Sequence, residues 1–191
     1  EDRYPPEGMT TLTLDLGGAM MNIAGTTTIL PNGATGPVYE TEPLEQDVWI
    51  AGLPRLHIDV STATVGGQIY ALLEDCNENG SCIHIGHAIM DLRYHEGGTD
   101  EQTWLPIIEI INAKMEFFTL DAQVSAGHTI KLSLASTGED YLPASTSSVV
   151  TIQEGSGSNL LLDLIDPSEK VLFDPPKCTH TACNDWTNQT M

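Results

Sequence analysis

The stretch PLEQDVWIAGLPRLHIDVS, residues 43–61, decides the fold. In its second half the apolar residues Leu56, Ile58 and Val60 alternate strictly with polar ones. A period of two is typical of a strand with one face in the core and one face in water. The triplet Gly52-Leu53-Pro54 interrupts the apolar pattern, and glycine and proline both disturb a strand interior. The stretch therefore predicts a strand, a corner and a longer strand.

The same alternation recurs along the chain, with turn signals between the alternating segments. The other predicted strands are Thr10–Leu16, Gln68–Glu74, Ile83–Tyr94, Lys114–Leu120, His128–Ser136, Val149–Ile152 and Leu160–Leu164. The faces expected to point inward carry Ile69, Ala71 and Leu73, and Ile130, Leu132 and Leu134. Between Leu16 and Val48 we expect a long ordered loop with one or two short strands, and Pro106–Ile111 is expected to be extended. Helical periodicity is nearly absent, so the pattern indicates an all-β sandwich or barrel.

The length of 191 residues fits one domain. We expect a β-sandwich over residues 1–166 and a tail rich in Pro, Thr and Asn over residues 167–191. No run of about 18 apolar residues occurs, so the sequence predicts no membrane span. The first residue is Glu1 rather than Met, as expected if a leader or an upstream domain is missing from this sequence.

The charge is strongly one-sided, with 7 Lys and Arg against 27 Asp and Glu and a formal net charge of −20. Such a surface repels the phosphates of nucleic acids and anionic lipids, so neither is an expected partner. A solvated acidic surface explains the charge most simply. Cation binding and adaptation to a salty or acidic habitat are the functional alternatives.

Four cysteines form two tight pairs, Cys76 with Cys82 and Cys178 with Cys183. Local pairing is the simplest of the three possible connectivities. Two short disulfides predict an oxidising compartment, and hence an extracellular or cell-surface protein. The alternative is a zinc site at Cys178, His180 and Cys183, but no fourth ligand is near in the sequence.

One loop matches the first half of a calcium-binding loop. Asp75, Asn77 and Asn79 alternate ahead of Gly80, as oxygen ligands do around a glycine in a calcium loop. The twelfth position, where a bidentate Glu is expected, is Gly86. Asn79-Gly80 is also a common hairpin tip, so a simple turn is the alternative to a calcium site. No other cofactor is implied.

The signals for catalysis and modification are few. Gly-x-Ser-x-Gly, the nucleophile elbow, does not occur. His84 and His87 are three residues apart on a predicted strand, so we expect them on opposite faces as ordinary surface residues. Gly86 between them is expected to form a bulge. His128 is expected to be structural, and Asn188 opens a glycosylation sequon of low specificity.

The strand blocks, in their order and spacing, resemble the C-terminal β-domain of X-prolyl dipeptidyl peptidases and cocaine esterase-like hydrolases. The resemblance is spread over Arg3 to about Leu164. The matching pieces are Pro5–Gly8 with Thr11–Leu14, Thr41–Leu44 with Ile50–Pro54, Leu56–Ser61, Ala71–Asp75 with Asn79-Gly80, Ile85-Gly86, Ala126–Leu132, Ser136 and Tyr141–Pro143.

The resemblance implies a jelly-roll sandwich of the galactose-binding-like type. In such hydrolases the Ser-His-Asp triad lies in a preceding α/β-hydrolase domain, so no catalytic residue can be transferred to this chain. The β-domain packs on that domain, forms a wall of the substrate cleft and often helps the protein to dimerise. The implied partners are therefore an α/β-hydrolase domain or like subunits in a homo-oligomer. The two cysteine pairs and the tail after Leu164 depart from the family pattern.

Three functions follow from these observations. The first is the non-catalytic jelly-roll part of a secreted serine hydrolase. The second is a stand-alone extracellular subunit that assembles with itself, for which the Thr-rich first strand could extend a neighbour's sheet. The third is a carbohydrate-binding module, which usually presents exposed aromatic residues, and the chain has only Trp49, Trp104 and Trp186.

Overall fold

The computed structural model describes residues 9–17, 27–31, 35–64, 66–96, 102–103, 105–138, 141–142, 149–155 and 157–165. Regular structure in this part consists of β-strands and one short 3-10 helix, η1 (Leu92–Tyr94). The strands are β1 (Thr10–Asp15), β2 (Thr27–Pro31), β3 (Thr35–Glu40), β4 (Val48–Gly52), β5 (Arg55–Thr62), β6 (Gln68–Cys76), β7 (Cys82–Asp91), β8 (Ile111–Glu116), β9 (Leu120–Val124), β10 (Thr129–Ala135), β11 (Val149–Gln153) and β12 (Asn159–Ile165). None of the described helical structure has the length and apolarity needed to cross a membrane.

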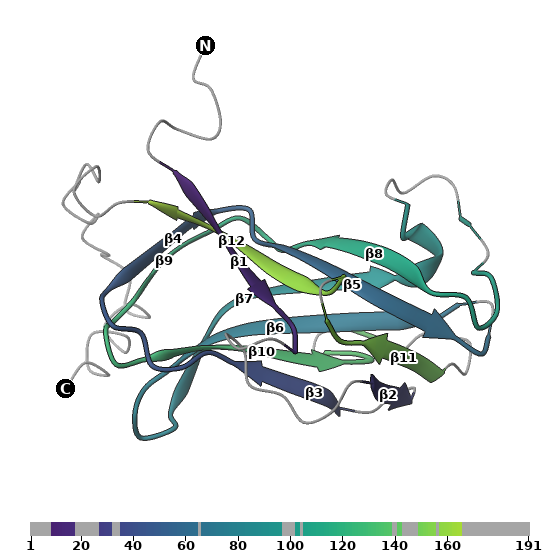
Figure 1. Cartoon of the computed structure of the whole chain (residues 1–191), viewed down its shortest axis with the longest axis horizontal. Helices are drawn as coiled ribbons and strands as arrows, with labels where there is room; N and C mark the ends of the chain where they lie inside the picture. Colours follow the sequence, from purple (N-terminus) through teal and green to yellow (C-terminus); the bar gives the residue numbers. More distant parts are fainter. Residues whose placement is uncertain are drawn as a thin grey trace, which may run out of the picture.

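Two antiparallel sheets face each other (Figure 1). The first sheet contains β1, β2, β4, β5, β8, β9, β11 and β12, and the second has the order β3-β10-β6-β7. Non-consecutive neighbours in both sheets show that the chain crosses repeatedly from one sheet to the other. The all-β sandwich expected from the alternating segments is confirmed.

The first sheet is built largely from long strands that are each broken once. β4 continues into β5, β8 into β9, and β11 into β12. β5 lies between β11 and β8, while β4 lies between β12 and β9, so the broken strands run side by side. The corner predicted at Gly52-Leu53-Pro54 is the break between β4 and β5, and Gly52 has a φ of 110°.

The breaks are joined by hydrogen bonds between neighbouring strands. The Phe117 amide donates to the Pro54 carbonyl at 3.0 Å, so the corner of β8-β9 lies against the corner of β4-β5. In the break between β11 and β12, the Ser158 hydroxyl accepts from the Asp59 amide at 2.9 Å. Ser158 is fully buried, and its hydroxyl satisfies a backbone donor of β5 that the broken partner strand leaves free.

The core lies between the inner faces of the two sheets. Leu56, Ile58 and Val60 are at most 1% exposed, as their alternation predicts. The predicted inner faces of β6 and β10 are confirmed in the same way, because Ile69, Ala71, Leu73, Ile130, Leu132 and Leu134 are all buried. Burying a large apolar side chain contributes about 1.5–3 kcal/mol, so these alternating faces are the main source of stability.

Two predicted segments differ from the structure. Lys114–Leu120 is not one strand, because β8 ends at Glu116 and β9 begins at Leu120. Pro106–Ile111 is not extended throughout, because a turn forms at Ile107 and Ile108 before β8 begins. By contrast, the short strands expected between Leu16 and Val48 are confirmed as β2 and β3. Residues 167–191 lie outside the described part, so the division into sandwich and tail stays a prediction.

Candidate functional site

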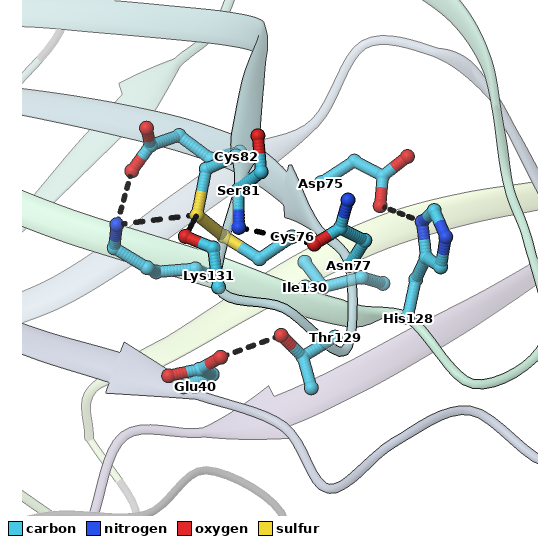
Figure 2. Close-up of a disulfide and its surroundings, with 12 residues drawn as sticks. Glu40, Asp75, Cys76, Asn77, Ser81, Cys82, His128, Thr129, Ile130 and Lys131 are labelled. Atoms are coloured by element: carbon cyan, nitrogen blue, oxygen red, sulfur yellow. Dashed lines mark hydrogen bonds and ion pairs between the residues drawn. A yellow bond between two sulfur atoms is a disulfide. The ribbon is translucent and has the colours of Figure 1, made fainter. Parts of the chain in front are cut away.

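A disulfide closes the hairpin between β6 and β7 (Figure 2). Cys76 ends β6, Cys82 begins β7, and the two are register partners whose Cα atoms lie 4.0 Å apart. On the neighbouring strand β10, Lys131 Nζ lies 2.8 Å from Glu74 Oε2 and 3.7 Å from Cys82 Sγ. The disulfide thus closes the end of the second sheet, and the half-buried ion pair of Lys131 and Glu74 lies beside it.

The residues of the calcium-like pattern make protein contacts in this hairpin. Asp75 is 5% exposed, and its Oδ1 lies 2.7 Å from His128 Nδ1 at the start of β10 (Figure 2). Asn77 Oδ1 accepts from the amides of Asn79 and Ser81, each at 3.0 Å. Asn77 therefore folds the loop as an Asx turn. The contact with Asp75 supports the structural role expected for His128, which stays a prediction. Calcium binding at Asp75, Asn77 and Asn79 stays a prediction.

The facing expected for the histidine pair of β7 is wrong. His84 and His87 do not lie on opposite faces, because the register shifts by one residue between the pairs Leu73–Gly86 and Glu74–His84. This bulge, which was expected at Gly86, places both rings on the outer face of the second sheet. His87 Nδ1 lies 3.2 Å from His84 Nε2.

Aromatic rings surround this pair on the outer face of the second sheet. His87 Nε2 lies 3.0 Å from the Tyr141 hydroxyl. The rings of Tyr70 and Phe118 lie 5.8 and 5.1 Å from the ring of His87, measured between centroids. Beside them, a groove of about 510 Å³ lies between β3, β10 and β6, and His84 is among its lining residues. His87 is thus held on several sides, while His84 faces solvent.

A second groove, of about 750 Å³, lies beside β8 and is lined by basic side chains together with the acidic Asp91, Glu96 and Glu116. Arg55 and His57 of β5 and Lys114 of β8 share the outer face of the first sheet there. Burial, and then the charges of Lys114 and Arg55, lower the pKa of His57 below its ordinary range. Arg55 is fixed by the nearly buried Asp163 of β12 at 2.9 Å, and Asp163 also accepts from Thr11 of β1.

A turn of exposed isoleucines precedes β8. Ile107, Ile108 and Ile110 are 55%, 76% and 61% exposed. Ile108 has a φ of 69°, which is an outlier for a β-branched residue. Its amide donates to the Thr62 carbonyl at 2.9 Å, so the turn is anchored to the end of β5. The half-exposed Val149 lies close by, because its neighbour Val150 pairs with Thr62.

Neither the isoleucine turn nor the histidine pair is predicted by the sequence pattern above. The run Ile107-Ile108-Glu109-Ile110 after Pro106 has no period of two, and this lack of alternation was the available signal against a strand. For the histidine pair, the available signal was the bulge expected at Gly86. A bulge between two residues of a strand reverses their relative facing, so it places His84 and His87 on the same face.

Several predicted residues lie outside the described part of the chain. These are Cys178, His180, Cys183 and Asn188, together with Trp104 and Trp186. The tail disulfide, the zinc alternative and glycosylation therefore stay predictions. Of the three tryptophans considered for a carbohydrate-binding module, Trp49 lies in the described part. It is half-buried, and its indole donates to Asp121 of β9. Among the described residues, no three His, Cys, Asp or Glu side chains gather as a metal site.

Solved structures share this architecture. A CocE/NonD family hydrolase from Staphylococcus aureus matches with a TM-score of 0.71 at 11% identity, over 85% of this chain and 38% of that chain. An aminopeptidase from a marine sediment archaeon, Thaumarchaeota archaeon, matches with a TM-score of 0.60 at 15% identity, over 68% of this chain and 26% of that one. An α-amino acid ester hydrolase matches with a TM-score of 0.59 at 15% identity, over 85% and 33%.

These identities show the fold alone, and the chain spans 38% of the length of the Staphylococcus aureus hydrolase. No curated protein matches the chain. The family model of the X-Pro dipeptidyl-peptidase C-terminal non-catalytic domain matches residues 7–164, which is most of the chain. The sandwich and the extent of this match agree with the resemblance in the sequence, and the chain belongs to the family of C-terminal non-catalytic domains of X-Pro dipeptidyl-peptidases.

Proposed function

We propose that this domain is the non-catalytic part of a secreted serine hydrolase of the acyl or peptide hydrolase class. It packs against an α/β-hydrolase catalytic domain and forms one wall of the substrate cleft. The family match over residues 7–164 carries this proposal. The matched region covers only 38% and 33% of two similar hydrolases, which leaves room in such proteins for a catalytic domain.

The isoleucine turn, Ile107–Ile110, is the proposed docking surface. Three exposed isoleucines within four residues are unusual in a chain with a net charge of −20. Exposed apolar patches of this kind commonly mark interfaces. Covering each isoleucine would contribute about 1.5–3 kcal/mol, before the cost of association. The unfavourable φ of Ile108 is the kind of local strain that is kept where a residue has a function.

The groove with Arg55, His57 and Lys114 is the proposed wall of the cleft. It is lined by Lys114 of β8, the strand that follows the isoleucine turn, and Lys114 lies four residues beyond Ile110, or about 13 Å along an extended strand. A catalytic domain that covers the turn would therefore reach the groove. Its lining combines Lys114 and His57 with Asp91, Glu96 and Glu116, so it offers both hydrogen-bond donors and acceptors to the amide or ester group of a substrate.

The disulfide of the β6-β7 hairpin supports secretion, because such bonds persist in oxidising compartments.

One feature favours the alternative of a self-assembling subunit. β1 pairs with β12 on one side, and no described strand pairs with its other side. An open edge can accept a strand from a second copy.

The two functions are separated by isolating the native polypeptide with an antibody against this domain, from cells and from culture medium separately. The hydrolase proposal predicts a secreted polypeptide well above 20.6 kDa that a fluorophosphonate probe labels at serine. Recovery of an unlabelled chain of about this mass, without a labelled partner, would contradict it. Large assemblies of that short chain would favour the self-assembling subunit.

A further inference from the structure

The two histidines that the bulge of β7 places on one face have the geometry of a shared metal site. His84 Nε2 and His87 Nδ1 are 3.2 Å apart. Two imidazole nitrogens that bind one tetrahedral metal at about 2.0–2.1 Å lie about 3.3 Å from each other. The observed separation therefore suits one ion between the two rings.

The surroundings of His87 fix the nitrogen that it presents. Its Nε2 faces the Tyr141 hydroxyl at 3.0 Å. When Nε2 carries the proton and donates to this hydroxyl, Nδ1 keeps its lone pair and points it toward His84. A histidine that binds a metal usually donates its other ring N–H to a fixed partner in this way. The rings of Tyr70 and Phe118 restrict the rotation of His87 further.

We propose that His84 and His87 bind a divalent first-row transition metal ion, with Zn²⁺, Ni²⁺ and Cu²⁺ as the candidates. Water molecules would fill the remaining positions, since among the described residues no third His, Cys, Asp or Glu joins the pair. Imidazole suits these metals better than it suits Ca²⁺ or Mg²⁺. The net charge of −20 raises the local concentration of cations near the exposed His84.

The competing explanation for the short distance is a hydrogen bond between the rings, in which one nitrogen donates to the other. The two explanations predict different responses to added metal. A hydrogen bond alone leaves the histidines no better as ligands than other surface histidines. A shared site gives an affinity that depends on both residues and falls with acidification, because protons compete with the metal for neutral imidazole.

The test is titration of the full 191-residue chain with Zn²⁺ and Ni²⁺ against a chelating indicator at pH 7.5 and pH 5.5, with the disulfides oxidised. His84→Ala and His87→Ala are each expected to raise the Kd at least tenfold, and lowering the pH to 5.5 should abolish binding. His95→Ala is the matched control, because it removes a histidine from elsewhere in the chain and should leave the Kd unchanged.

Proton NMR on the same samples gives a second measurement that does not depend on affinity. Zn²⁺ should shift or broaden the ring resonances of His84 and His87 at lower concentration than those of the other histidines. Equal affinity in the wild type and in both alanine variants, or ring shifts confined to other histidines, would overturn the proposal.

Discussion

The Tyr39 hydroxyl lies 3.3 Å from Glu154 Oε1, and this hydrogen bond joins the two sheets of the sandwich. Tyr39 belongs to β3 of the second sheet and is fully buried. Glu154 lies in the break between β11 and β12 of the first sheet. Burial, and then the charge and hydrogen bond of Glu154, raise the pKa of Tyr39 far above its ordinary value.

Tyr39→Phe should lower the free energy of unfolding by about 1.5–3 kcal/mol at neutral pH, since a hydrogen bond to a charged carboxylate is lost. At alkaline pH the variant should lose less stability than the wild type does. Above about pH 10 a tyrosine ionises in the unfolded chain, whereas Tyr39 stays protonated in the folded chain, so unfolding becomes more favourable. Urea denaturation between pH 8 and pH 11 measures this, and parallel pH curves would contradict it.

Ile58→Asp should cost about 3–5 kcal/mol, because it buries a carboxylate without a partner in the middle of β5. Ile58 is fully buried, and its register partner Ala113 on β8 is buried as well. Urea denaturation gives the difference, with Asp59→Asn on the outer face as the matched control. A loss below about 1 kcal/mol for Ile58→Asp would mean that the facing of β5 is wrong.

Replacing Cys76 and Cys82 together by serine should lower the free energy of unfolding by about 2 kcal/mol. The disulfide closes a loop with a sequence separation of only six residues, so it removes little entropy from the unfolded chain. Alkylation of the unreduced, unfolded protein followed by peptide mapping checks the pairing. Labelled Cys76 or Cys82, or a disulfide that links either one to the tail, would contradict the assigned bond.

His57 should titrate below its ordinary value of 6.5. The folded state favours the neutral imidazole of His57. As the pH falls below 6.5, the unfolded chain takes up a proton more readily than the folded chain does, so the free energy of unfolding decreases. Lys114→Gln removes one of the causes and should raise the NMR titration midpoint of His57. Lys131→Gln, on the other sheet, is the control and should leave the midpoint unchanged. A midpoint at or above 6.5 in the wild type would be contrary evidence.

The faces of the strands could be predicted from the sequence because burial of one face imposes a period of two on the residues. This holds for Leu56, Ile58 and Val60 and for the inner face of β10, and in each case the structure agrees. The corner at Gly52-Leu53-Pro54 was predictable too, because its residues carry backbone signals of their own. The family followed from the order of these blocks rather than from any single residue.

The failures have a common physical origin in neighbouring strands. The break at Phe117 carries no glycine or proline, and it lies opposite Pro54, whose carbonyl accepts its amide hydrogen bond. Its position is thus imposed by another strand. The pairing of His84 with His87 likewise depends on a register shift against β6, which local periodicity does not contain.

Docking through the isoleucine turn is tested most directly by carbene footprinting of the native polypeptide, isolated as described above. Labelling of Ile107, Ile108 and Ile110 is compared with that of Ile83, which is 61% exposed and lies on the other sheet. Each value is normalised to the unfolded protein. If a catalytic domain covers the turn, its isoleucines should be labelled several-fold less than Ile83. Labelling of the turn as strong as that of Ile83 would contradict docking at this surface.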